Sequence, residues 1–124
     1  MGPYALQASI AACHATALTA ADTDWARIAA LYDALGQIAP SPVIELNRAV
    51  AVGMAFGPSA GLEIVEALSE SGVLAKYHLL PAVRGDLLAK LGRDREAAAE
   101  FARAASLTQN ARERELLLRR AVES

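Results

Sequence analysis

Few residues of this sequence have the type and spacing that catalysis or metal binding requires. Cys13 and His14 are adjacent, but neighbouring positions on a helix point about 100° apart, so thiol and imidazole cannot share a proton there. The other histidine, His78, lies far along the chain. No metal-binding pair spacing and no glycine-rich phosphate loop is present. We therefore expect no catalytic residue, no metal and no cofactor, and a protein that is not an enzyme.

Charge and composition narrow the function classes further. The 124 residues carry 12 basic and 14 acidic side chains, a net charge of −2, which is unlike a nucleic-acid-binding domain. Cys13 is the only cysteine, so no internal disulfide can form, and a buried thiol in a reducing cytoplasm fits best. The longest apolar run, Ala49 to Phe56, is too short to cross a bilayer. Met1-Gly2-Pro3 lacks the basic flank of a signal peptide, and nothing indicates an oligomeric state.

Prolines, glycines and capping residues divide the chain into helices. No segment alternates with a two-residue period, so no strand is predicted and the fold class is all-α. Ser41-Pro42 and Asp94 mark helix starts, Gly57 and Gly92 mark ends, and Asn110 with Glu113 forms a capping box. Seven helices are expected, over residues 4–20, from Trp25 to before Pro40, from Pro42 to Phe56, and over about 59–70, 77–91, 94–107 and 110–123.

A 34-residue period groups these helices into pairs. The third unit carries the small–small–aromatic–small pattern of the tetratricopeptide repeat (TPR), with Gly85, Gly92, Ala97, Phe101 and Ala104. We expect one domain, residues 1–124, a TPR-like right-handed helical repeat array with repeats at about 9–42, 43–76 and 78–111. A capping helix at about 110–123 should place Leu117, Leu118, Ala121 and Val122 on one face and most charged residues on the other.

Polar residues inside apolar runs are the candidates for a binding site. Asn47 and Arg48 interrupt a helix that should be mostly buried, either as structural groups that satisfy helix ends or as groove residues. In a helical array the first helix of each pair lines the concave face, which could hold an extended peptide or a partner helix. The candidate groove residues are Cys13, Asn47, Arg48, Met54, Asp86 and Lys90. Gln7, His14, His78 and Arg84 are candidates for contacts between helices instead.

Several segments resemble one family beyond the generic repeat. They are Gly2–Ala8, Ile10–Ala15, Thr23–Trp25, Leu31–Asp33, Ser41–Ala51, Tyr77–Ala82, Asp86–Leu88 and Leu91–Arg93, and Leu-Asn-Arg-Ala-Val at residues 46–50 is the most specific. Over residues 2–122 the chain is similar to the TPR-like C-terminal extension of bacterial RNA polymerase sigma factors of the extracytoplasmic-function (ECF) subfamily. The resemblance implies a fragment of a longer cytoplasmic protein, whose promoter-binding regions lie outside this sequence. Ala12, Leu46 and Pro81 stand where the generic repeat has a large aromatic, so its known peptide clamps are not carried over.

Three functions are compatible with the sequence. The resemblance implies a regulatory, protein-interaction domain that contacts the sigma regions of its own chain or RNA polymerase and modulates transcription initiation. Promoter DNA would then be bound only through the missing N-terminal regions. The alternatives are a free-standing TPR-like adaptor with a peptide or partner helix in its groove, and an enzyme or small-ligand sensor that uses a groove near His14 and His78.

Overall fold

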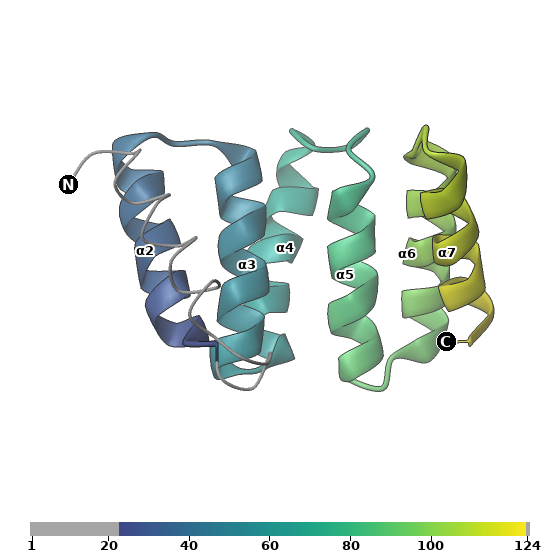
Figure 1. The fold of residues 1–124 in the computed structure, drawn as a ribbon, viewed down its shortest axis with the longest axis horizontal. Helices are drawn as coiled ribbons and strands as arrows, with labels where there is room; N and C mark the ends of the chain where they lie inside the picture. Colours follow the sequence, from purple (N-terminus) through teal and green to yellow (C-terminus); the bar gives the residue numbers. More distant parts are fainter. Residues whose placement is uncertain (1–22, 124) are drawn as a thin grey trace. The chain divides into compact units, whose positions relative to one another are not determined.

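The computed structural model describes residues 23–123, which form six α-helices and no strand (Figure 1). The all-α prediction is therefore confirmed for this range. The helices are α2 (Trp25–Ile38), α3 (Pro42–Phe56), α4 (Pro58–Ser71), α5 (Leu79–Lys90), α6 (Asp94–Leu107) and α7 (Ala111–Glu123). The helix expected over residues 4–20, and with it Cys13 and His14, lies outside the described range.

The chain divides into two compact units, residues 1–61 and 62–124, with the boundary inside α4. Each is described separately below. The predictions that residues 1–124 form one domain and that the helix pairs stack as a repeat array stay predictions. In residues 23–123 we find no helix with both the length and the apolar character needed to cross a bilayer.

In the first unit, α2 and α3 pack side by side around a small apolar core (Figure 1). The α2 helix begins at Trp25, as predicted, and is capped by Asp24, whose Oδ1 accepts a hydrogen bond from the Arg27 backbone N–H at 3.1 Å. The centre of the core is Ile28, which is fully buried, and the partly buried rings of Trp25 and Tyr32 pack against it. Ala29 and Ala51 are also buried in this core, and Leu31 and Val52 pack against it.

The turn from α3 to α4 depends on glycine at two positions. Gly57 ends α3 with φ 107°, a left-handed conformation that other residues avoid. A Cβ at Gly61 would lie 2.7 Å from the Ala49 carbonyl oxygen and 3.0 Å from the Gly53 Cα. The first turn of α4 therefore rests directly on the backbone of α3.

In the second unit, α5 and α6 form a hairpin closed by Gly92. Gly92 has φ 77°, and the Arg93 backbone N–H donates to the Leu88 carbonyl oxygen at 2.9 Å, which satisfies a carbonyl at the end of α5. Where the two helices face each other, Phe101 of α6 is fully buried against Gly85 of α5. Because a Cβ at Gly85 would lie 2.9 Å from the ring, only glycine leaves room for this aromatic side chain.

Three helix starts differ from their predicted capping. Ser41 stands at the N-cap of α3 but makes no side-chain cap bond, and Pro42 starts the helix in the first turn. Arg93 occupies the N-cap position of α6. Asp94 is the first helical residue, where its carboxylate interacts favourably with the helix dipole. Asn110 Oδ1 does cap the Glu113 N–H at 3.0 Å, but the Glu113 carboxylate bonds other groups and no reciprocal capping box forms.

The last helix of the second unit, α7, packs on its neighbours with a different face from the predicted one. Of its residues, all of which the structure describes, only Leu117 is buried. Leu116, Leu118 and Val122 are 50%, 47% and 87% exposed. The prediction that Leu118 and Val122 share the inner face with Leu117 is therefore wrong, because α7 docks through Leu117 and through polar contacts of Glu113, Arg114 and Arg120.

Candidate interaction surface

Three predicted groove residues lie on α3, in the first unit. Asn47 is exposed and Met54 is 42% exposed, so both side chains are available at the surface. Arg48 is half-buried and binds its neighbour Glu45 through two hydrogen bonds, Nε to Oε1 at 3.0 Å and Nη2 to Oε2 at 3.1 Å. That hydrogen bonding to Glu45, together with the charges of Glu45 and Asp33, raises the pKa of the Arg48 guanidinium despite its partial burial.

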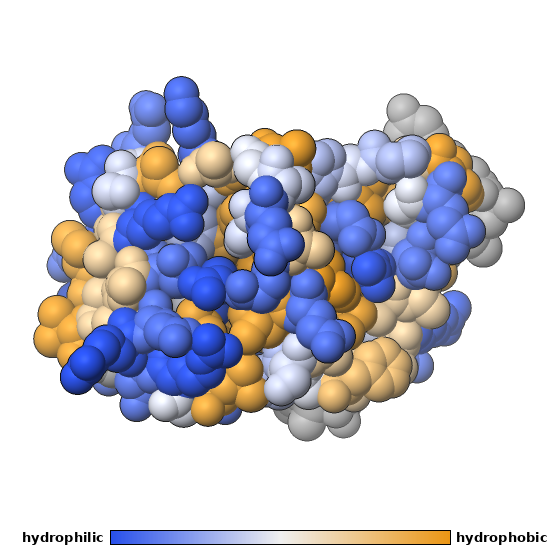
Figure 2. Space-filling model, turned by 180° about the vertical axis from the view of Figure 1, so that it is seen from behind, coloured by the Kyte–Doolittle hydropathy of each residue, from blue (hydrophilic) through white to orange (hydrophobic). Residues whose placement is uncertain are grey.

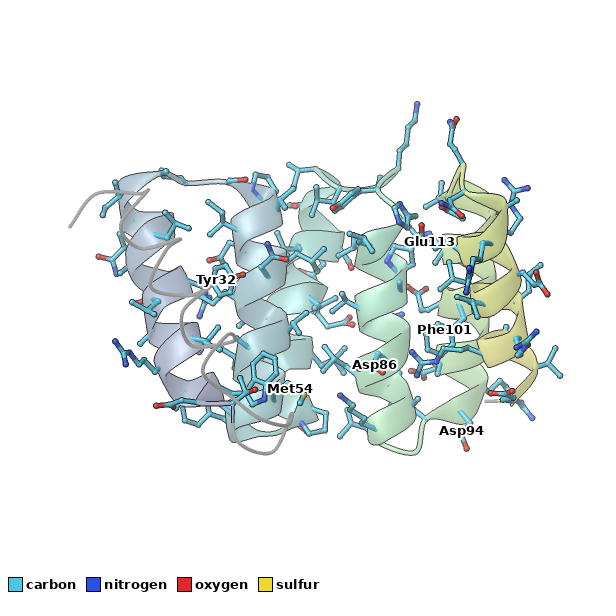
Figure 3. All side chains as sticks on the ribbon, viewed as in Figure 1. Tyr32, Met54, Asp86, Asp94, Phe101 and Glu113 are labelled. Carbon is cyan, nitrogen blue, oxygen red and sulfur yellow. The ribbon has the colours of Figure 1, made fainter. Side chains whose placement is uncertain are left out.

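The other two described groove residues, Asp86 and Lys90, lie one turn apart on α5 in the second unit. Figure 3 labels Asp86 on this helix. Asp86 accepts two charged contacts: Oδ2 lies 3.0 Å from Lys90 Nζ, and Oδ1 accepts a hydrogen bond from Arg120 Nη2 at 3.0 Å. Arg120 belongs to α7 and also stands over the Phe101 ring, 4.3 Å from its centroid. Asp86, a predicted groove residue, thus connects α5 to the last helix, α7.

A second polar contact joins α5 to α7 at the other end of these helices. The His78 Nε2 lies 2.7 Å from Glu113 Oε1, and the Thr108 hydroxyl donates to Glu113 Oε2 at 3.3 Å. Glu113 lies in the first turn of α7, where its carboxylate also interacts favourably with the positive end of the helix dipole. His78 therefore makes the contact between helices that the sequence predicts for it.

Arg84 makes the other such contact, between α5 and two neighbouring helices of the second unit. Its Nε donates to Glu66 Oε1 on α4 at 2.6 Å, and its Nη1 lies 3.4 Å from Glu100 Oε1 on α6. Burial lowers the pKa of the Arg84 guanidinium, but the hydrogen bond to Glu66 and the nearby carboxylates outweigh this and raise it. Glu100 is buried with only 8% exposure, so its charge depends on Arg84 and on Arg103, 3.8 Å away.

Arg114 fixes the junction between α6 and α7. Its Nε donates to the Ala105 carbonyl oxygen at 3.2 Å and its Nη2 to the Thr108 carbonyl oxygen at 2.8 Å. These carbonyls stand at the end of α6, where no helical N–H can reach them, so a side chain of α7 completes the preceding helix.

Sequence reasoning missed Glu113, Arg114 and Arg120 as inward-facing residues of α7. Two of them contact residues that precede them by nearly the repeat distance. Asp86 on α5 pairs with Arg120, 34 positions later, and His78, the N-cap of α5, pairs with Glu113, 35 positions later. Pairing opposite charges at an offset of 34 residues would have found the contact of Asp86 with Arg120. Asn47, Arg48 and Met54 lie in one unit and Asp86 and Lys90 in the other, and Cys13 lies outside the described residues, so the groove as a whole stays a prediction.

Over residues 23–123, no three His, Cys, Asp or Glu side chains come together as metal ligands would. Every ionic contact described above ties one helix to another or to its own next turn. Apolar atoms reach the surface at the end of the molecule formed by α6 and α7, among hydrophilic residues (Figure 2). In α7 these exposed apolar residues are Leu116, Leu118 and Val122.

Comparison with known proteins found one significant match among curated proteins. Over 112 residues, 90% of this chain, the sequence is 50% identical to an uncharacterized protein of Rhizobium meliloti (strain 1021). No family model matches the chain, and no solved structure matches it significantly. The matched stretch makes up only 26% of the relative, so the chain spans about a quarter of the length of the protein that it resembles.

Proposed function

We propose that this chain is a TPR-like interaction domain of a longer bacterial protein, and that the parent is an ECF-type sigma factor whose transcription initiation the domain regulates. The observation that carries the repeat assignment is the pair of polar contacts between α5 and α7. Their spacings of 34 and 35 residues match the 34-residue period of the sequence. Equivalent positions of successive first helices come together in a helical array, and these contacts have that character.

The length of the relative supports a parent protein with further domains. Roughly three quarters of that protein lies outside the matched stretch. The Leu-Asn-Arg-Ala-Val segment, which carries the sigma-factor resemblance, occupies residues 46–50 on α3. On that helix Asn47 is exposed while Leu46 and Ala49 are buried, so the segment combines a core face with a surface polar group. Such a helix both holds the domain together and offers contacts to the sigma regions or to RNA polymerase.

The domain would act by contact and not by chemistry. In the first unit, α3 presents a hydrogen-bonding group at exposed Asn47 and an apolar group at Met54. In the second unit, α5 presents the ion pair of Asp86 and Lys90. Contacts of this mixed kind give specificity for a protein partner, since a partner must match both apolar and charged positions. Promoter DNA would be bound by the sigma regions, outside this sequence.

Transcription by the parent protein tests this function. Removal of the region corresponding to residues 1–124 should change promoter-driven output by at least about tenfold, since loss of roughly 1.4 kcal/mol of contact energy is a tenfold effect. The exchange of a surface group without a partner role, Ser59→Ala on exposed Ser59, is the control and should leave output unchanged. An unchanged output after removal of the whole region would contradict the regulatory role.

A second function, a free-standing adaptor, is favoured by the exposure of Asn47 and Met54 on one helix. In that case the isolated chain would bind a peptide or partner helix by itself, and Asn47→Ala would weaken binding while Ser59→Ala would not. Titration of purified RNA polymerase with the parent protein and with the chain alone separates the two. Only the sigma-factor function predicts polymerase binding that requires the parent.

A further inference from the structure

The outward side of α7 carries an apolar pair without a described neighbour. Leu118 and Val122 are one helical turn apart and are 47% and 87% exposed. Leu117, about 100° around the helix from Leu118, is buried, and Arg120, about 200° from Leu118, reaches Asp86 and Phe101. The α7 helix therefore docks through Leu117 and Arg120 and leaves Leu118 and Val122 exposed.

The equivalent face of α5 shows what such a face contacts in this fold. A shift of 34 residues, the offset from Asp86 to Arg120, takes Arg84 to Leu118 and Leu88 to Val122. On α5 this face receives α6. There Arg84 lies 3.4 Å from Glu100, the neighbouring Gly85 leaves room for Phe101, and Leu88 is fully buried.

We propose that α7 is the first helix of an incomplete helix pair, and that Leu118 and Val122 dock an amphipathic helix supplied by the rest of the longer parent polypeptide. The inference rests on the proposed function in one respect, the existence of a longer parent. The occupant is assigned to the same polypeptide because roughly three quarters of the relative lies outside the matched stretch, and a helix tethered in the same chain has a high effective concentration.

The chemistry of the face defines the helix that it fits. Two aliphatic side chains one turn apart need apolar partners at matching three- and four-residue spacing on the incoming helix. The rim is polar: Arg119 and Glu115 pair at 3.5 Å with side chains 61% and 73% exposed, so they can remain hydrated when the centre is covered. The incoming helix should therefore be apolar on one narrow stripe and polar on its flanks, as α6 is.

Cysteine reactivity in the full parent polypeptide tests whether the face is covered. Leu118→Cys and Leu116→Cys form a matched pair, because the two positions are 47% and 50% exposed in the present structure but point about 200° apart. Alkylation at each site is followed by mass spectrometry of its own peptide, so Cys13 and other cysteines do not interfere. We expect Leu118→Cys to react at least about tenfold more slowly than Leu116→Cys, as protected sites in folded structure do.

A second change distinguishes coverage from any intrinsic slowness of the site. Adding Val122→Asp, which places a charge in the covered apolar face, should raise the rate at Leu118→Cys to that at Leu116→Cys. Equal rates at the two cysteines without this change would overturn the proposal. Slow reaction that appears only at high protein concentration would assign the face to a second copy and would equally overturn it. Either result leaves the transcription test of the proposed function unaffected.

Discussion

Asp86 on α5 and Arg120 on α7 form an ion pair at 3.0 Å across 34 residues of sequence, and the guanidinium that makes it also covers the Phe101 ring. Together with the contact of His78 and Glu113, this pair holds a helix that has a single buried apolar side chain. The docking of α7 is therefore more polar than that of α5 on α6, and it should respond to charge removal and to salt.

We predict that Arg120→Ala lowers the free energy of unfolding more than Asp86→Ala. Both variants lose their shared ion pair, worth about 0.2–1 kcal/mol. Arg120→Ala also loses a cation–π contact worth about 0.5–1 kcal/mol, whereas Asp86→Ala also loses only an exposed pair with Lys90 worth about 0.3–0.5 kcal/mol. A double-mutant cycle in urea measures the coupling, which should fall at high salt. Arg119→Ala is the control, since its pair with Glu115 is more exposed and longer. A coupling of zero would show that the contact does not hold α7.

Two glycine-to-alanine changes should have opposite effects on stability. At Gly85 the new Cβ would lie 2.9 Å from the buried Phe101 ring, and such overpacking costs about 1–3 kcal/mol, more than the roughly 1 kcal/mol gained in helix propensity. At Gly36 the nearest atoms lie at 3.8 Å, so alanine should stabilise the helix by about 0.5–1 kcal/mol. Thermal unfolding of both variants measures the difference. Gly85→Ala with Phe101→Leu should recover part of the loss.

Removal of Arg84 should be among the most harmful single changes in the second unit. Arg84→Ala leaves Glu100 buried with only Arg103 nearby, and an uncompensated buried charge costs about 3–5 kcal/mol. The half-exposed Glu66 and Arg103 place the expected loss at the low end of that range. Chemical denaturation measures it.

Arg84→Met combined with Glu100→Leu should restore most of this stability, because apolar residues of similar size need no ionic partner. Arg93→Ala is the matched control, since it breaks an exposed pair with Glu96 and should change stability by at most about 0.5 kcal/mol. Equal losses for Arg84→Ala and Arg93→Ala would contradict the role given to the buried carboxylate.

Stability at alkaline pH should depend on Tyr32. Burial raises the pKa of the Tyr32 phenol above its ordinary value of 10.0. The unfolded chain then loses its phenolic proton at lower pH than the folded chain, so this contribution is present below pH 10.0 and is lost as the pH rises through the folded pKa. Tyr32→Phe should flatten the decline, measured as unfolding free energy against pH. Tyr77→Phe serves as the comparison, and an equal effect of both would contradict the assignment to Tyr32.

Local signals in the sequence were sufficient for most helix boundaries. Gly57 and Gly92 adopt positive φ where helices were predicted to end, because the chain there needs a conformation that glycine provides at little cost. The Asp24 cap and the end of α3 at Phe56 follow the same local rules. The predicted Asp94 cap is wrong by one residue, because α6 begins at Asp94 itself and Arg93 occupies the N-cap position without a side-chain cap bond.

The candidate surface was less predictable, because its contacts join residues far apart in sequence. Apolar side chains were assigned to the inside of α7, whereas Glu113 and Arg120 face inward to meet His78 and Asp86. Only the position of the facing helix decides between these two orientations. Arg48 is different, because its partner Glu45 is only three residues away in the sequence. A structural role for Arg48 was therefore one of the two roles that the sequence alone indicated.

Arg114 donates hydrogen bonds to the carbonyls of Ala105 and Thr108, and these bonds affect how the C-terminal part of the domain unfolds. If α7 peeled away alone, two oxygens at the finish of α6 would lose their donors, so the preceding helix would be loosened in the same event. Unravelling from the C-terminus should therefore proceed as one joint step through both helices and not residue by residue.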